Sequence, residues 1–319
     1  MLCHGTELMD VGSGGDPITV SQLLDEYAAY GFRVRDLAGD TVKQRRLYID
    51  RFLSTEPVSS KGLASLTPSS IQRFMFRYAK GYGPGSVRWM QSSLRAFLRF
   101  CYHREYVSSE LSAAVPIYRV WRLSKVPRAI NEETIQRLLE SIDPVSPNGL
   151  RDLAIIQLLV TYGVRGIQIR RLRLEDVDWA GNCIHFRAVK GGRAIDQHLT
   201  PEAGNSLLAY IRDERSNKSP YTEIFLTSRT SCHPFGRSSS LSNVINGRLR
   251  RIDVQLPEGV SHGTHSFRHA FAARLVGEVP FKHIADMLGH RDLSSTFVYS
   301  KVNLKALGEA AQPWPVEVE

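Results

Sequence analysis

Apolar side chains recur at helical spacing from about residue 18 to residue 116, with no run that alternates as a strand would. Ile71, Phe74 and Tyr78 share one face of a predicted helix, because they are separated by one helical turn each. After a glycine-rich turn, a second helix is expected with Ser86 as its N-cap. The residues on its inward face are Val87, Met90, Leu94, Phe97 and Cys101.

The period changes in the second half of the chain. Asn131 is a predicted N-cap, and a helix over residues 150–162 is expected to end at Gly163. Apolar residues then alternate with polar ones on both sides of a glycine turn at residues 190–193, which predicts a β-hairpin. Its alternating residues are Ile184, Phe186, Ile195 and Leu199. Further helices are predicted over residues 201–214, 241–252, 266–277 and 281–288.

These patterns predict a mainly α protein of two domains, the second mixed α/β with a small antiparallel sheet. A flexible leader is expected over residues 1–17, a helical domain over 18–116 and a basic, proline-bearing linker over 117–130. The second domain is expected over 131–302, followed by a tail over 303–319.

Composition describes a globular protein, with 42% apolar and 23% charged residues. No apolar run reaches the roughly 18 residues of a membrane span, and the start lacks the pattern of a signal peptide. Four scattered cysteines without a C-x-x-C pair indicate reduced thiols and a cytoplasmic protein. A net charge of +9 suggests a polyanionic partner.

The positive charge gathers in the first domain, where residues 57–104 contain eight Lys or Arg and no Asp or Glu. Scattered arginines usually form ordinary solvated helix faces. Here no acid offsets the positive field over two consecutive helices, which favours a surface that binds DNA phosphates. The residues of this predicted surface are Arg73, Arg77, Lys80, Arg88, Arg95 and Arg99.

Six polar residues of the second domain form the candidate catalytic set. They are Arg165, Lys190, His265, Arg268, His290 and Tyr299. Each alone has an ordinary explanation, such as a solvated cation or a partly buried aromatic residue. His265 and His269 lie four apart and could face a metal, but the H-E-x-x-H form is missing, so no metal site is predicted.

Together the set resembles the tyrosine recombinase (phage integrase) family, over about residues 18–307. The shared pattern is an arginine after a small turn, a hairpin lysine, an H-x-x-R helix start, an L-G-H segment and a tyrosine nine residues later. The resemblance implies a helical, SAM-like core-binding domain and a catalytic domain with the fold of the DNA breaking-rejoining enzymes. It also implies site-specific recombination that leads to integration, excision or resolution.

The resemblance assigns Tyr299 as the nucleophile that forms a 3′-phosphotyrosyl link, without ATP or a metal cofactor. Arg165 and Arg268 suit the scissile phosphate, because guanidinium groups meet its oxygens bidentately and stay charged. Lys190 is the expected general acid for the 5′-oxygen, and His265 the group for proton transfer at the tyrosine. His290 would hydrogen-bond a non-bridging oxygen.

The partners that the resemblance implies are double-stranded DNA, with which the chain would lie in the nucleoid, and further copies of the chain. A dimer on each site and a tetramer in synapsis are expected, and in the family the tail often docks on a neighbouring protomer. Many relatives carry an acid where this chain has Gln168, which can hydrogen-bond but cannot neutralise Arg165.

Three alternatives stay open at the level of the sequence. A type IB topoisomerase shares this chemistry and would relax a supercoiled plasmid. A catalytically silent DNA-binding relative would form no covalent adduct on its site. A basic helical protein of unrelated function would do neither.

Overall fold

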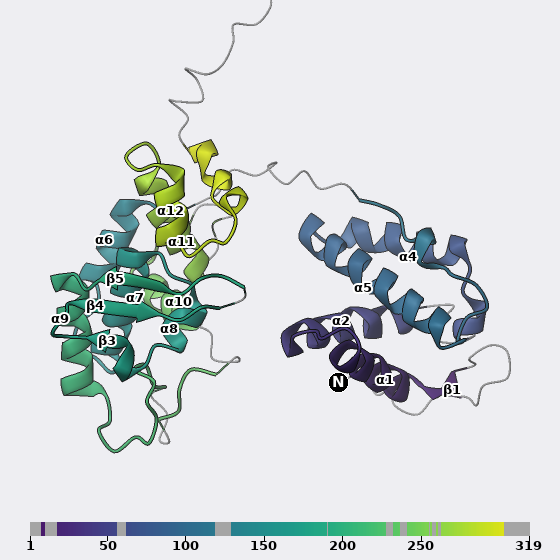
Figure 1. Ribbon diagram of the computed structural model, residues 1–319, viewed down its shortest axis with the longest axis horizontal. Helices are drawn as coiled ribbons and strands as arrows, with labels where there is room; N and C mark the ends of the chain where they lie inside the picture. Colours follow the sequence, from purple (N-terminus) through teal and green to yellow (C-terminus); the bar gives the residue numbers. More distant parts are fainter. Residues whose placement is uncertain are drawn as a thin grey trace, which may run out of the picture. The chain divides into compact units, whose positions relative to one another are not determined.

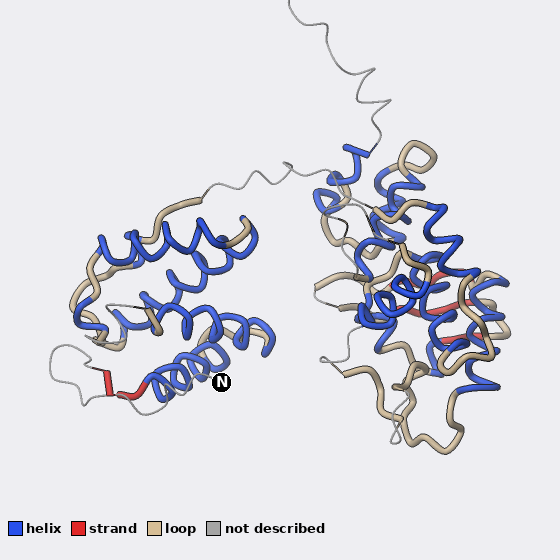
Figure 2. Tube along the Cα trace, turned by 180° about the vertical axis from the view of Figure 1, so that it is seen from behind, coloured by secondary structure: helices blue, strands red, loops and turns tan. Residues whose placement is uncertain are grey.

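The computed structural model describes residues 8–9, 18–55, 62–118, 129–189, 191–227, 232–236, 241–254, 256, 260 and 263–302. The chain forms two compact units, Met1–Arg122 and Leu123–Glu319. Helix dominates both units, and strand is confined to short segments (Figure 2). The predicted fold class, mainly helical with a small antiparallel sheet, is confirmed.

The first unit is built from helices α1 (Val20–Arg33), α2 (Gly39–Leu53), α4 (Pro68–Gly81) and α5 (Pro84–His103). Helices α1 and α5 both pack against α2, and α4 packs against α5. Side-chain caps begin two of the helices, because Thr19 accepts from Gln22 N and Thr67 accepts from Ser70 N. A short antiparallel pair, β1 (Leu8–Met9) with β2 (Ile18–Thr19), was not predicted.

The predicted inward face of α5 is confirmed. Its five apolar residues are at most 4% exposed and join one apolar core with α1, α2 and α4. The predicted cap at Ser86 is wrong, because α5 begins three residues earlier than that cap implies, with Gly83 as N-cap and Pro84 in the first turn. Proline is favoured there, since its fixed φ suits a helix and its missing N–H would have had no partner.

The second unit contains the predicted hairpin, formed by β4 (Cys183–Phe186) and β5 (Ile195–His198). A third strand, β3 (Val177–Asp178), extends the sheet in the antiparallel order β3-β4-β5. Ile184 and Phe186 are fully buried, as their alternation predicted. Strand β5 lies at the edge of the sheet nearest to α12 (Phe281–Met287), visible in Figure 1.

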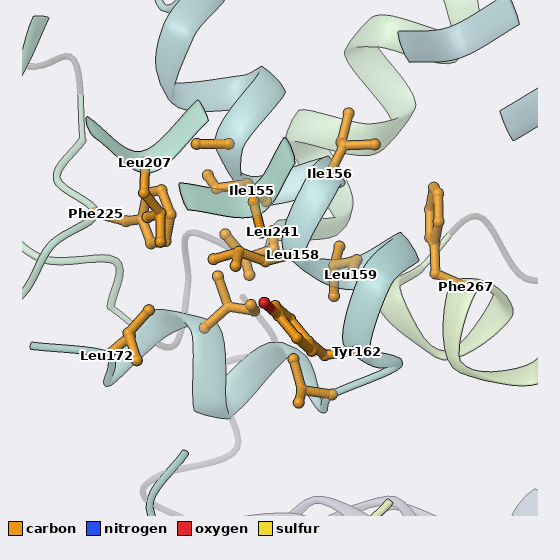
Figure 3. Packing of buried hydrophobic residues seen from close by; sticks show 14 of the residues in the cluster. Ile155, Ile156, Leu158, Leu159, Tyr162, Leu172, Leu207, Phe225, Leu241 and Phe267 are labelled. Atoms are coloured by element: carbon orange, nitrogen blue, oxygen red, sulfur yellow. The ribbon is translucent and has the colours of Figure 1, made fainter. Parts of the chain in front are cut away.

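Seven α-helices are described in the second unit. They are α6 (Glu132–Glu140), α7 (Gly149–Tyr162), α8 (Gly166–Arg170), α9 (Pro201–Ala209), α10 (Leu241–Arg251), α11 (Thr264–Leu275) and α12. Helix α7 is central, since α6, α8, α9, α10 and α11 all contact it. Its side chains Ile155, Leu158 and Leu159 lie among residues from several other elements, such as Phe225 (Figure 3).

Most predicted helix ends in this unit are confirmed. The Asn131 side chain accepts from Thr134 N at 3.0 Å, and α7 ends at Gly163 in the left-handed conformation. The helix expected over 201–214 is helical throughout, as α9 to Ala209 and then as a π-helical turn from Tyr210 to Glu214. None of the described helices is long and apolar enough to cross a bilayer.

Candidate active site

Arg165 follows the end of α7 and immediately precedes α8. Gly163 can end α7 because its φ is +57°, a conformation that favours glycine. The backbone N–H of Arg165 donates to Gln168 Oε1 at 3.0 Å, and Gln168 Nε2 donates to Arg187 O at 3.3 Å. Within the described part of the chain, the buried Nη1 of Arg165 has no hydrogen-bond partner. The guanidinium therefore keeps a donor available for an anion.

Arg268 lies on α11, is 3% exposed and is held from several sides. Its Nη1 donates to Gly163 O at 3.0 Å, and its Nη2 donates to Leu288 O at 2.7 Å. Burial, followed by the like charge of Arg165, lowers the pKa of Arg268 to about 10. The guanidinium stays charged at neutral pH, so two cations lie close together at this point.

His290 follows Gly289, whose φ of +63° ends the α12 segment in the left-handed conformation. Its Nε2 lies 2.7 Å from Arg268 Nη2, and its Nδ1 lies 2.7 Å from Thr296 Oγ1. Burial and the positive charges of Arg268 and Arg165 lower the pKa of His290 to about 4. The imidazole is therefore neutral at physiological pH.

Tyr299 lies in a short 3-10 helix, Phe297–Val302, and is 3% exposed. Its ring belongs to a small apolar cluster with Phe271, Ile284 and Leu288. Its hydroxyl is 3.1 Å from His269 Nδ1. Burial raises the pKa of Tyr299. The charge of Arg268, a hydrogen bond from Arg268 and the charge of Arg165 all lower it. The phenol thus lies within the field of both arginines.

Lys190 is outside the described residues, but both sides of its turn are described. An added Cβ on Gly192 would lie 3.1 Å from Arg165 Nη1 and 3.0 Å from Gly289 O. The backbone N–H of Arg193 donates to that same Gly289 carbonyl at 3.3 Å. The hairpin turn at Gly192 and Arg193 therefore lies against both Arg165 and the segment that carries His290.

His265 lies on the first turn of α11 and is exposed. Its ring centroid is 6.5 Å from that of His269, one turn later. The structure therefore brings His269, rather than His265, to the hydroxyl of Tyr299. In the sequence, the signal for this residue is weak, because a four-residue His265–His269 spacing is also that of a metal-binding helix face. Among the described residues no cluster of three or more His, Cys, Asp or Glu suits a metal ion.

The basic residues predicted to bind DNA lie in the first unit, on α4 and α5. Arg73, Arg77, Lys80, Arg88 and Arg99 are exposed. Arg95 and Arg99 donate hydrogen bonds within the fold, to Val115 O at 2.7 Å and to Ser112 Oγ at 3.2 Å, and Lys80 Nζ lies 4.6 Å from the centre of the Phe76 ring. The side chains of Arg95 and Arg99 hold the segment after α5, whereas Arg73 and Arg77 extend from α4.

Comparison with known proteins gives a consistent picture. Residues 128–305 match the model of the phage integrase family. The chain is 31% identical over 306 residues to the putative integrase/recombinase y4rA of Sinorhizobium fredii, over 95% of this chain and 73% of that protein. It is 25% identical over 297 residues to the tyrosine recombinase XerA of Pyrococcus furiosus, over 92% and 93% of the two chains.

Two solved structures share the fold. A lambda integrase dimer bound to a core site has a TM-score of 0.66 at 16% identity, over 95% of this chain and 100% of that one. The XerH recombinase bound to its difH substrate after cleavage has a TM-score of 0.66 at 17% identity, over 93% and 85%. At these identities the likeness concerns the fold alone.

Proposed function

The chain belongs to the phage integrase family, and we propose that it is a tyrosine-type site-specific recombinase that cuts and rejoins DNA through Tyr299. The observation that carries this proposal is the surrounding of the phenol. Its hydroxyl interacts with Arg268 and lies in the field of Arg165, whose buried Nη1 has no partner among the described residues. Neither arginine forms an ion pair with a described carboxylate, and two such cations beside a nucleophile suit a DNA phosphate.

The arginines would act on the phosphate in different ways. Arg268 is held by two backbone carbonyls and His290, so it presents a preorganised charge. Arg165 has an unused donor and would gain its partner when the phosphate enters. Negative charge that grows on the non-bridging oxygens in the transition state would be stabilised by both groups.

Proton transfers would complete the reaction. As the tyrosine oxygen attacks phosphorus, an imidazole of α11 would accept the phenol proton, a role that the sequence assigns to His265. Lys190 would protonate the departing 5′-oxygen, since Gly192 in the same hairpin turn lies against Arg165. The 3′-phosphotyrosyl bond conserves the energy of the phosphodiester, so attack by a different 5′-hydroxyl rejoins the DNA without ATP.

His290 would contribute through a hydrogen bond to a non-bridging oxygen. In the DNA-free chain its Nε2 accepts from Arg268, so that bond requires Nε2 to leave the arginine and to carry a ring proton that it can donate to the phosphate. A DNA partner is supported by the relatives, since the lambda integrase and XerH structures contain recombinases bound to DNA. We extend the proposal to a dimer on each site and a tetramer in synapsis, with integration, excision or resolution as the outcome.

The test is recovery of DNA joined covalently to the protein. The full chain is incubated with DNA from its own genome, the protein is denatured, and DNA that remains attached is sequenced. Wild-type protein should give one enriched site, and Tyr299→Phe should give none. Equal recovery with both proteins, or none with the wild type, would overturn the proposal.

A further inference from the structure

The hydroxyl of Tyr299 lies between two neighbouring side chains of α11. Arg268 interacts with it from one side, and His269 Nδ1 lies 3.1 Å away. The rings of His269 and Tyr299 are 5.5 Å apart between centroids. Because Tyr299 is 3% exposed, water has little access to compete for the phenol proton.

The chemistry of Arg268 fixes the direction of one of the two hydrogen bonds, and the tautomer of His269 decides the other. An arginine can only donate, so the phenol oxygen accepts from Arg268. The single phenol hydrogen is then available to His269, and in the tautomer whose ring proton lies on Nε2, the lone pair on Nδ1 accepts it. This arrangement places the proton on the path from the nucleophile to a base.

The charged and titratable groups around His269 keep it ready to accept. They are His265 on the preceding turn, Arg268 beside it and Tyr299 opposite. Burial, His265 and Arg268 all lower the pKa of His269, so its imidazole is neutral at physiological pH. Burial also raises the pKa of the phenol, which therefore keeps its proton until a base removes it.

We propose that His269 is the general base that takes the proton of Tyr299 during DNA cleavage. This inference rests on the proposed recombinase function and names the imidazole that its chemistry needs. The O–H bond breaks toward Nδ1, and the freed electron pair forms the bond from oxygen to phosphorus. The bond from phosphorus to the 5′-oxygen breaks, and that oxygen receives a proton from the general acid. Rejoining returns the first proton from His269 to Tyr299.

Two variants separate a base from a residue that only positions the tyrosine. His269→Asn places an amide oxygen near the site of Nδ1, so it can keep the hydrogen bond but cannot take the proton. His269→Phe removes both properties. His283→Asn, on an exposed histidine of α12, is the matched control. The probe is a synthetic nicked duplex with the sequence recovered on the wild-type protein, and the measurement is the rate of covalent complex formation against pH.

If His269 is the general base, His269→Asn and His269→Phe should slow cleavage by about 100-fold or more at neutral pH, and His283→Asn should not. The rate of His269→Asn should rise with pH where the wild-type rate has levelled. A 5′-thiolate leaving group needs no general acid, so a duplex that carries one should be cleaved as slowly by His269→Asn, relative to the wild type, as the ordinary duplex. If the wild type cleaves and His269→Asn cleaves at the same rate, His269 is not the general base and only a positioning role remains. Absence of wild-type cleavage would instead count against the recombinase itself.

A measurement without DNA tests the proton's location. In the full chain with ¹⁵N-labelled histidine, the His269 signal, assigned through His269→Asn, should show a neutral ring with its proton on Nε2. Tyr299→Phe should change that signal and raise the fraction protonated at pH 6. A proton found on Nδ1 would contradict the proposal, even if a variant used in cleavage failed to fold.

Discussion

The guanidinium of Arg268 donates to Nε2 of His290 across 2.7 Å. An arginine has no acceptor, so this contact requires a lone pair on Nε2, and the ring proton must lie on Nδ1, facing Thr296 Oγ1 at 2.7 Å. His290 is thus neutral, in agreement with its pKa of about 4. Through His290, Arg268 is linked to Thr296, which lies three residues before Tyr299.

The lowered pKa of His290 predicts that acid destabilises the fold. A histidine has a pKa near 6.5 in the unfolded chain and about 4 here, so the unfolded state binds the proton first as pH falls. The stabilisation is complete above pH 6.5 and is lost as pH falls toward 4. From pH 7 to pH 5 the loss from His290 should be about 2 kcal/mol.

Urea unfolding at the two pH values measures this loss. His290→Gln keeps an acceptor for Arg268 but does not titrate, so its free energy of unfolding should change less with pH than that of the wild type. The lowered pKa of His269 acts in the same direction in both proteins and does not affect the difference. An equal pH dependence in the two proteins would show that His290 does not titrate as described.

Gly163 is expected to resist substitution more than an ordinary glycine. Its φ is +57°, and an added Cβ would lie 2.6 Å from ring atoms of Phe271. Gly163→Ala should cost about 2 kcal/mol or more of folding free energy. It should also weaken cleavage, because the Gly163 carbonyl holds Arg268. The control is Gly247→Ala on the exposed side of α10, where nothing lies within 4 Å and helix propensity predicts a gain of about 0.5–1 kcal/mol.

Gln168 holds the backbone of Arg165 rather than its guanidinium. Gln168→Leu should leave the Arg165 N–H and the Arg187 carbonyl without these partners, at a cost of about 1–3 kcal/mol. Gln168→Glu keeps the acceptor but loses the donor, so an intermediate loss is expected. Gln157→Leu, at a half-buried glutamine whose side chain donates to the side chain of Thr161 one turn later, should cost much less. A Gln168→Leu protein as stable as the wild type in urea would refute this role.

Two arginines of the first unit should behave differently. Arg77 is exposed on α4, so Arg77→Ala should weaken binding to a non-specific duplex, reduce the salt slope by about 1 and leave stability unchanged. Arg95→Ala should lower stability by about 1–3 kcal/mol, because it removes the bond to Val115 O. Fluorescence anisotropy at several salt concentrations, with thermal unfolding, measures both. If the dependence of the binding constant on salt concentration is unchanged in Arg77→Ala, Arg77 on α4 does not contact DNA phosphates.

The sequence by itself determined the local elements and the order of the candidate catalytic residues. Period, caps and glycine turns depend on neighbours a few residues away, so the inward face of α5, the cap at Asn131 and the hairpin could be predicted. The prediction at Ser86 was wrong because two nearby signals can each start the helix. Gly83 and Pro84 begin it before Ser86 can cap it. The short strands β1, β2 and β3 are too brief for a recognisable alternation.

Only the tertiary structure decided how the polar side chains meet. Arg268 reaches a carbonyl 105 positions away, and that contact depends on how α11 packs against α7. The same packing brings His269, rather than His265, to Tyr299. Spacing along one helix shows which side chains share a face, but not which of them meets a segment from elsewhere. That is set by burial and by the geometry of hydrogen bonds between distant parts of the chain.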